Sequence, residues 1–536
     1  MVVLLLMGLY FRVAHLDRPV YWVDEVATSI RVAGYTRPAI AQQLATGEPI
    51  AVAELQQFQQ LGGDRPWADT WNALTQSPEH APLYFLMVRA WAERFGSSMV
   101  AIRSLSVVLG VVAIPCFIWA SKALLLPSVV GQLGAGLLAI SPFFVAYSQE
   151  ARPYSLWTVA LLLLMGLLGR SLHNNTPRSW LGYILALVLS LYTSLLTGFV
   201  VLGQALAVLS LDFPRFTCRT RNYLLATGLG LGAFIPWGWI IFNHWQTLQD
   251  NTVWMREAIA PWATAAVWFY SLAVLWFDVP LSVDLSLETL VKALVALGVV
   301  ALIGYAAFTF YRETPPVVGR SVILGAIAPP LVLLLIDGLR SGQAAATPRY
   351  LIPTLLGALV SVAYLLGDRL HRFPRNPYWR TITAALLSLG LLSCTIGLTH
   401  TSDYQKARNR ANPAIAALIN QSPNPVLLAE ANLTMDVLSL SHSLDVSTII
   451  RILPSSQYLI EHPLCREAWV LNPSSALQES LGGSDRLHLI YRPDLLTSED
   501  VHLSLWRLLP DTQTCKYVAI NKSQWGVPAA GGRTPP

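Results

Sequence analysis

Two acidic residues, Asp24 and Glu25, stand side by side in the stretch RPVYWVDEVATSIR, soon after the first apolar segment of the chain. An adjacent carboxylate pair can stabilise the first turn of a helix through the helix dipole, bind a cation or accept a proton from an attacking hydroxyl group. The helix interpretation is the ordinary one, because acidic residues favour first helical turns. Tyr21 and Trp22 precede the pair, and such aromatic residues are typical of membrane interfaces. We therefore test the hypothesis of general-base chemistry at a membrane surface.

A histidine marks a second stretch, EHAPLYFLMVRAW at residues 79–91. Pro82 suits the first turn of a helix. His80 stands just before it, where it is either a surface or capping residue or a site residue that can exchange a proton near neutral pH. The pattern alone leaves both interpretations open.

The third stretch, SPFFVAYSQEARPYSL at residues 141–156, places Glu150 and Arg152 between two apolar segments. Ionisable groups at the mouth of apolar helices are costly and often functional. The alternative is an Arg–Glu pair that closes a helix end.

In the fourth stretch, ATPRYLIP at residues 346–353, Arg349 and Tyr350 begin an apolar run. An arginine there can bind a phosphate through two parallel hydrogen bonds. It can equally extend toward lipid headgroups.

The composition indicates which elements must position these residues. Of the 536 residues, 54% are hydrophobic and only 12% are charged, whereas soluble domains have about 25% charged residues. We predict a polytopic α-helical membrane protein. The net charge of +5 is spread over many loops rather than gathered in one patch, which argues against a nucleic-acid partner.

Apolar segments of about 20 residues can cross a bilayer as helices. The sequence predicts about eleven transmembrane helices, the first of them short and interrupted by Arg12. That first segment lacks a basic leader and a cleavage site, so a removable signal peptide is not expected, and its true beginning can lie upstream of Met1. The predicted segments are 1–16, 99–121, 128–146, 154–170, 179–193, 197–211, 223–242, 288–311, 321–337, 350–367 and 381–398.

Lysine and arginine in the short loops predict the orientation, since they are enriched on the cytoplasmic side. With a cytoplasmic N-terminus, the cytoplasmic loops carry the larger share of these residues. Asp24 and Glu25 then lie outside, in an outer loop at residues 17–98. Residues 83–95 and 262–277 are expected to lie along the interface as amphipathic helices, although 262–277 could also re-enter or span the bilayer.

The composition becomes polar near residue 399, which predicts a domain boundary. We expect a transmembrane domain at 1–398, a small extracytoplasmic α/β domain at 399–525 and a disordered tail at 526–536. NPVLLAEANLTMDVLSL reads as a strand followed by a helix, and VSTIIRIL and REAWVLNP read as strands. In an oxidising compartment Cys465 and Cys515 could form a disulfide.

The ordered set YWVDE, HAPLYFL, SQEARPYSL and PRYLIP resembles the GT-C glycosyltransferases of the family 39 type. That family includes the protein O-mannosyltransferases and the bacterial aminoarabinose transferase of lipid A. The resemblance covers residues 21 to 353 and rests on the order of the motifs and their predicted side of the membrane. Two departures are Ala81, where the family has a second proline, and a long outer segment at 36–79.

The resemblance implies catalytic roles for Asp24, as general base, and for Glu25. It implies a substrate-binding role for a further group at the mouth of the site, and our own hypothesis is that Arg349 in this group contacts the donor phosphate. This group is His80, Tyr84, Gln149, Glu150, Arg152, Tyr154, Arg349 and Tyr350.

The resemblance also implies a reaction. A polyprenyl-phosphate sugar is the expected donor, and a lipid, glycan or protein of the cell envelope is the expected acceptor, on the outer face of the plasma (inner) membrane. A nucleotide sugar fits less well, because the sequence has no glycine-rich phosphate loop. Asp24 would deprotonate the acceptor hydroxyl, and the configuration at the sugar would invert. Arg349 or Arg152 would stabilise the leaving phosphate. A divalent cation shared by Asp24 and Glu25 is a further option for this role.

Two other function classes stay open. Eleven spans also suit a lipid or glycan transporter or flippase, although two matching broken helices, which such folds often have, are not evident. Alternatively, the membrane region could be a scaffold for a C-terminal domain that binds glycans or another partner.

Overall fold

A computed structural model describes most of the chain, and its contacts divide it into two units. The described residues are 1–62, 64–280, 286–399, 406–462, 464, 466–481, 486–493 and 503–510. Cys465, Cys515 and the predicted tail at 526–536 therefore lie outside the described residues. A helical unit comprises Met1–Pro19, Thr28–Gly34 and Gln60–Gln405, and an α/β unit comprises Val20–Ala27, Tyr35–Gln59 and Lys406–Pro536.

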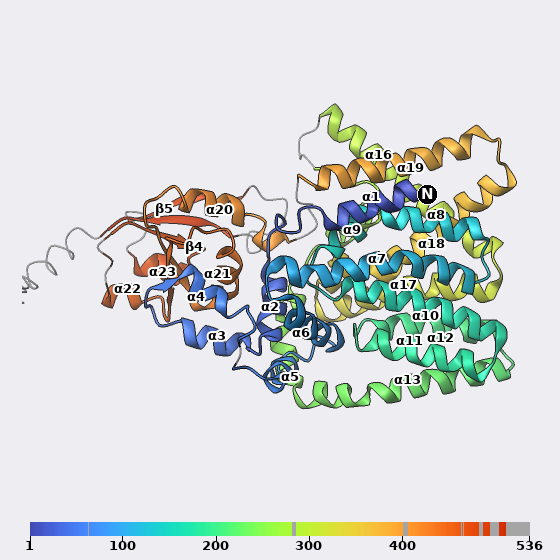
Figure 1. Ribbon diagram of the computed structural model, residues 1–536, viewed down its shortest axis with the longest axis horizontal. Helices are drawn as coiled ribbons and strands as arrows, with labels where there is room; N and C mark the ends of the chain where they lie inside the picture. Colours follow the sequence, from blue (N-terminus) through green and yellow to red (C-terminus); the bar gives the residue numbers. More distant parts are fainter. Residues whose placement is uncertain are drawn as a thin grey trace, which may run out of the picture. The chain divides into compact units, whose positions relative to one another are not determined.

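The helical unit contains a helix for each of the eleven predicted spans (Figure 1). Seven helices in the described ranges are long and apolar enough to cross a membrane, or eight if the bent pair α8 and α9 forms one span. Three more, α1, α11 and α12, are apolar but shorter, at 12, 15 and 16 residues. The helices are α1 (Val2–Val13), α7 (Met99–Ala123), α8 (Ser128–Ala139), α9 (Pro142–Ser148), α10 (Tyr154–Asn174), α11 (Pro177–Leu191), α12 (Thr197–Asp212), α13 (Cys218–Asn243), α16 (Leu287–Glu313), α17 (Pro316–Arg340), α18 (Ile352–Arg372) and α19 (Pro377–Gly397).

Short polar side chains begin several of these helices. Ser98, Thr176, Thr217 and Ser286 each accept a hydrogen bond from a backbone N–H in the first turn that follows, which satisfies a group that the helix itself leaves unpaired. α10 and α18 are the most buried of the long spans. They pack with α7, α8 and α17 and carry much of the largest apolar core.

Arg12 stabilises the break between α8 and α9, which are bent by 61°. Its guanidinium is buried and donates to the carbonyl oxygens of Ala139 at 2.6 Å, Leu138 at 3.0 Å and Gly8 at 2.9 Å. The carbonyls at the end of α8 thus receive donors that a continuous helix would have supplied. The arginine that interrupts the first apolar segment is therefore a structural part of the bundle.

Shorter helices complete the helical unit. The predicted interfacial segment 83–95 forms a helix with those bounds, α6 (Leu83–Phe95), and 262–277 overlaps α15 (Pro261–Ala273). Their depth in a bilayer stays a prediction. The others are α5 (Trp67–Thr75), α14 (Trp245–Asn251), η1 (Val253–Arg256), η2 (Ala344–Ala346) and η3 (Pro348–Leu351).

The α/β unit is built on a six-stranded sheet with the order β1-β3-β2-β4-β6-β5. β2 lies parallel to both β3 and β4, while β1, β5 and β6 each pair antiparallel to their neighbours. All three strands predicted from the sequence are confirmed as β2 (Val426–Glu430), β3 (Ile449–Leu453) and β4 (Ala468–Leu471). The remaining elements are β1 (Ile50–Ala51), β5 (Leu487–Tyr491), β6 (Leu505–Leu508), α3 (Arg37–Leu44), α4 (Val52–Gln57), α20 (Asn412–Ile419), α21 (Thr434–Leu440), α22 (Tyr458–Glu461), α23 (Ser475–Ser480), η4 (Ala407–Asn409) and η5 (Ala431–Leu433).

The α/β unit is discontinuous in sequence. Ile50 and Ala51 pair with Ile450 and Ile449, so that part of the long first outer segment forms an edge strand of the C-terminal sheet. Residues 20–27, which include the acidic pair, also cluster with this unit. A pairing over such a distance leaves no local pattern in the sequence, because the two residues at 50–51 are too few to show a strand period.

Candidate active site

The acidic pair lies in the first turn of α2 (Val23–Val32), a helix that begins in the α/β unit and ends in the helical unit. The carbonyl of Trp22 accepts from the N–H groups of Glu25 at 2.9 Å and Val26 at 3.0 Å, which starts the helix. The N–H of Val23 donates to the side-chain oxygen of Asn409 at 2.9 Å. The helix dipole stabilises carboxylates at this position, so the pair does stabilise the first turn of a helix. This structural role is compatible with a role in catalysis.

The two carboxylates differ in their surroundings. Glu25 is fully buried, and Lys406 Nζ lies 3.1 Å from its Oε2. The same ammonium donates to the carbonyl of Val20 at 2.7 Å. Asp24 is partly exposed. A buried, paired carboxylate suits an orienting role, whereas a partly exposed one can reach a substrate.

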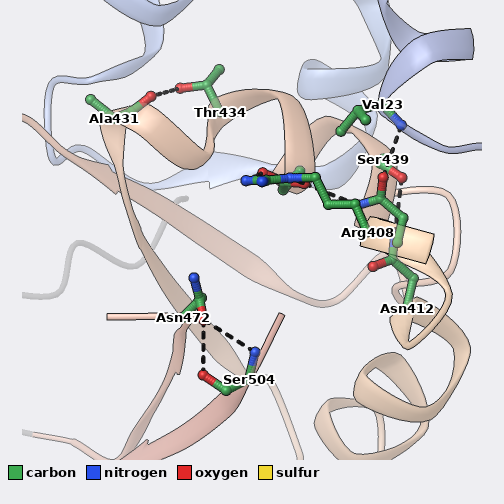
Figure 2. Close-up of polar contacts among 10 residues, drawn as sticks. Val23, Arg408, Asn412, Ala431, Thr434, Ser439, Asn472 and Ser504 are labelled. Atoms are coloured by element: carbon green, nitrogen blue, oxygen red, sulfur yellow. Dashed lines mark hydrogen bonds and ion pairs between the residues drawn. The ribbon is translucent and has the colours of Figure 1, made fainter. Parts of the chain in front are cut away.

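Other residues of the α/β unit fix the backbone around the pair. Ser439, in α21, donates through its hydroxyl to the carbonyl of Tyr21 at 2.6 Å, and Asn412 donates to that hydroxyl at 3.0 Å. Arg408 binds both carboxylate oxygens of the buried Asp436, at 2.8 and 2.7 Å. Figure 2 shows Val23, Arg408, Asn412 and Ser439 in this arrangement. The segment after Lys406 and helix α21 thus hold residues 20–25 in the α/β unit.

The same close-up covers the carboxyl ends of two parallel strands. Thr434 donates to the carbonyl of Ala431 at 2.6 Å just after β2, and Ser504 Oγ donates to Asn472 Oδ1 at 3.0 Å just after β4 (Figure 2). Ser474 donates to Glu430 through both its N–H and its hydroxyl, each at 2.8 Å. These bonds join neighbouring turns and have a structural role.

In the helical unit, the second and third motifs meet. The hydroxyl of Tyr84 lies 2.6 Å from that of Ser106 on α7, and Ser106 also approaches the carbonyl of Arg152 at 3.4 Å. The guanidinium of Arg152 bonds to Thr28 on α2 at 3.3 Å and lies 5.8 Å from the centre of the Tyr154 ring. Ser106, which the sequence patterns did not single out, therefore joins Tyr84 to Arg152, and Arg152 in turn lies next to Tyr154.

His80 belongs to a neighbouring charged group around Glu79. The carboxylate of Glu79 lies 3.7 Å from Arg31 Nη2 and 3.7 Å from His80 Nε2, and Asn251 donates to it at 3.1 and 3.2 Å. The Arg31 guanidinium is buried and lies 6.0 Å from the ring centre of Phe85, in α6. The sequence patterns did not single out Arg31 and Glu79, although both stand inside the quoted motifs.

The remaining predicted residues lie in other surroundings. Gln149 donates to the carbonyls of Phe11 at 2.9 Å and Ala14 at 3.0 Å, which satisfies the end of α1. Glu150 is buried beside Arg152 in the chain. Arg349 and Tyr350 lie in η3, where the guanidinium of Arg349 is 5.6 Å from the Tyr350 ring centre and 5.7 Å from that of Trp254.

Comparisons with known proteins bear on this arrangement. Residues 79–240 match the family model described as dolichyl-phosphate-mannose-protein mannosyltransferase, a region that includes His80, Tyr84 and Arg152. ArnT from Cupriavidus metallidurans in the apo state aligns with 94% of this chain and 96% of its own, at 14% identity and a TM-score of 0.51. The chain has the GT-C fold. The resemblance and the fold class predicted from the sequence motifs are thereby confirmed, and the protein is an integral membrane protein.

Two further structures are similar over large parts of the chain. ArnT from the same organism bound to undecaprenyl phosphate aligns with 94% of this chain and 96% of its own, at 13% identity and a TM-score of 0.49. Arabinofuranosyltransferase AftD from Mycobacteria aligns with 81% of this chain and 36% of its own, at 12% identity and a TM-score of 0.35. No curated protein matches the sequence.

The predicted divalent cation is not supported by the side chains around Glu25. Within the described ranges, no three His, Cys, Asp or Glu side chains gather as metal ligands do. The position beside the Glu25 carboxylate is taken by the ammonium of Lys406, which would repel a second cation. We therefore derive no step through a metal shared by Asp24 and Glu25.

Proposed function

We propose that this protein is a membrane glycosyltransferase that moves a sugar from a polyprenyl-phosphate donor to an acceptor hydroxyl on the outer face of the plasma membrane. The observation that carries the proposal is the match of residues 79–240 to a family of dolichyl-phosphate-mannose-dependent transferases. This region contains two of the four motifs, and Ser106 joins Tyr84 of one motif to Arg152 of the other.

Asp24 is the proposed general base. It would take the proton from the acceptor hydroxyl as that oxygen forms a bond to the anomeric carbon of the sugar. The bond from the anomeric carbon to the phosphate oxygen breaks on the opposite side, so the configuration at the sugar inverts. Glu25 orients its neighbour, because it is buried and bonded to Lys406. General-base assistance of this kind contributes about 10²–10⁴ in rate.

The leaving phosphate requires positive charge, and two arginines are proposed to supply it. Arg152 is held by Thr28 and Tyr154, and Arg349 is partly exposed between two aromatic rings. An arginine held in this way loses little freedom when it binds, and its planar donors fit phosphate oxygens.

The test uses the purified full-length chain in lipid, with a panel of radiolabelled polyprenyl-phosphate sugars. Wild type, Asp24→Asn and Asp17→Asn are compared for release of sugar to water or transfer to extracted envelope lipids. Asp17 is exposed and serves as the matched control.

We expect turnover in wild type and Asp17→Asn, and a loss of about 10²–10⁴-fold in a folded Asp24→Asn. Equal turnover in all three proteins would remove Asp24 as the base. If no protein released sugar from any donor while fluorescent lipids crossed the vesicle membrane, the transporter interpretation would replace the proposal.

A further inference from the structure

We propose that Lys406 is a positioning residue for the Asp24–Glu25 pair, so that the α/β unit is part of the catalytic apparatus rather than a separate binding module. This inference rests on the proposed function for the role of Asp24. The contact itself, between Lys406 and Glu25, is independent of it.

The first argument is the burial of both charges. The side chains of Glu25 and Lys406 are 0% and 2% exposed, and their charged atoms lie 3.1 Å apart. Removing two charges from water is costly, and each becomes strongly destabilising if its partner is taken away. Such a pair can be replaced by apolar residues without loss of stability, so packing alone gives no reason for charges here.

The second argument is that the ammonium of Lys406 bonds both before and within the first turn of α2. Lys406 Nζ donates to the carbonyl of Val20 at 2.7 Å as well as to Glu25. Its bonds therefore fix the path of the chain from Val20 into the first turn of α2, in which Asp24 lies. This anchor holds the start of α2, and with it the direction of the Asp24 side chain in the first turn.

The third argument is the backbone of Lys406 itself, with a φ angle of 57°. A residue with a side chain seldom adopts this left-handed conformation, and such strain persists only where the surroundings enforce it. Strained positions cluster at functional sites. Here the strain coincides with the residue that carries the buried charge.

Other residues of the α/β unit also hold the segment that carries the acidic pair. Asn409 accepts from the N–H of Val23, and Ser439 donates to the carbonyl of Tyr21. Both contacts, together with those of Lys406, converge on residues 20–25. The acidic motif is therefore held on its N-terminal side by a segment that follows the last apolar helix.

The experiment compares four full-length proteins in lipid: wild type, Lys406→Met, the double variant Glu25→Gln/Lys406→Met, and Arg507→Met. Arg507 forms an exposed pair with Glu467 in the same unit, so its loss controls for removal of a cation from the α/β unit. Two quantities are measured, the kcat and donor KM for sugar release, and the hydrogen–deuterium exchange of peptides that cover residues 20–33.

In Lys406→Met we expect kcat to fall by about 10²-fold, the scale of a misplaced general base, with donor KM changed by less than about threefold. Exchange over residues 20–27 should become faster. The double variant removes the Glu25 charge but still lacks the Lys406–Val20 bond that fixes the turn, so we expect exchange over residues 20–27 to stay faster than in wild type and kcat to stay at least about tenfold below wild type. Arg507→Met should match wild type in every measurement.

Two results would overturn the inference. One is wild-type exchange and kcat in Lys406→Met; the other is recovery of both to wild-type values in the double variant, which would show that Lys406 only balances the Glu25 charge and does not position the motif. If wild type itself released no sugar, the proposed function would fail separately. The exchange of residues 20–27 in the three variants would still decide whether Lys406 holds the motif.

Discussion

The hydroxyl groups of Tyr84 and Ser106 lie 2.6 Å apart, and both side chains are fully buried. Tyr84 comes from the motif at the start of α6, and Ser106 comes from the first half of α7, where it also approaches the carbonyl of Arg152. A buried hydroxyl without a partner is unfavourable, so this contact fixes the relation between two motifs that are far apart in the sequence.

Replacing Tyr84 with phenylalanine should show whether this contact serves the reaction. The matched control is Tyr183→Phe, because Tyr183 is equally buried and its hydroxyl lies 3.2 Å from that of Thr227, away from the motifs. Each variant should lose about 1 kcal/mol of stability in thermal unfolding in detergent. We expect turnover to fall several-fold in Tyr84→Phe alone, and equal turnover in the two variants would contradict a role for Tyr84 in the site.

A substitution of Arg349 can distinguish between binding of the donor phosphate and contact with lipid headgroups. If it binds the donor phosphate, Arg349→Gln should raise the donor KM by about 10–100-fold, since hydrogen bonds to charged groups contribute about 1.5–3 kcal/mol. The exposed Arg340 at the end of α17 provides the control variant Arg340→Gln. An unchanged donor KM in Arg349→Gln would favour the lipid interpretation.

Arg31 should be more important for stability than a surface arginine in the same unit. Its side chain is 2% exposed next to Glu79, whereas that of Arg65, paired with Asp69 at 3.8 Å, is 36% exposed. Loss of one partner from a buried pair costs about 3–5 kcal/mol, while exposed pairs contribute about 0–1 kcal/mol. Arg31→Met should therefore lower the unfolding temperature well beyond Arg65→Met, and similar values for the two would show that Glu79 does not depend on Arg31.

Arg12 offers a comparison between two arginines that each donate to backbone carbonyls of another helix. Arg12 is buried at the end of α8, and Arg320 donates to Ser210 in α12 from an exposed position. Arg12→Met removes the side-chain donor of the Ala139 carbonyl, at about 1–3 kcal/mol for a buried group, whereas water can replace Arg320. We expect poor yield and low thermal stability for Arg12→Met only, measured by fluorescence-detected size exclusion and heating.

Local patterns were sufficient for most helices. Apolar runs of about 20 residues predicted a helix for every span, and α6 has the bounds that were predicted for it. The strands β2, β3 and β4 were also found from their runs of branched residues. These helices and strands depend on residues that are close to one another in the sequence, so a single sequence is sufficient to predict them.

Long-range contacts were not accessible in this way. The pairing of Ile50 with Ile450 and the bond between Glu25 and Lys406 join residues about 400 positions apart, and neither leaves a periodic signal. Lys406 stands in a polar stretch where a lysine looks like an ordinary surface residue. The motifs indicated that Asp24 and Glu25 matter, and only the fold shows that they have different surroundings.

The discontinuity of the α/β unit has a consequence for biosynthesis. Glu25 and Lys406 are 381 residues apart, so at about 5–20 residues per second the ribosome needs about 20–75 s to deliver the second partner. The apolar helices from α7 to α19 emerge in that interval, while the acidic motif lacks its anchor. On the proposed function, the acidic motif is complete only after residue 406 has been synthesised, and a chain that stops before it would be inserted in the membrane yet remain inactive.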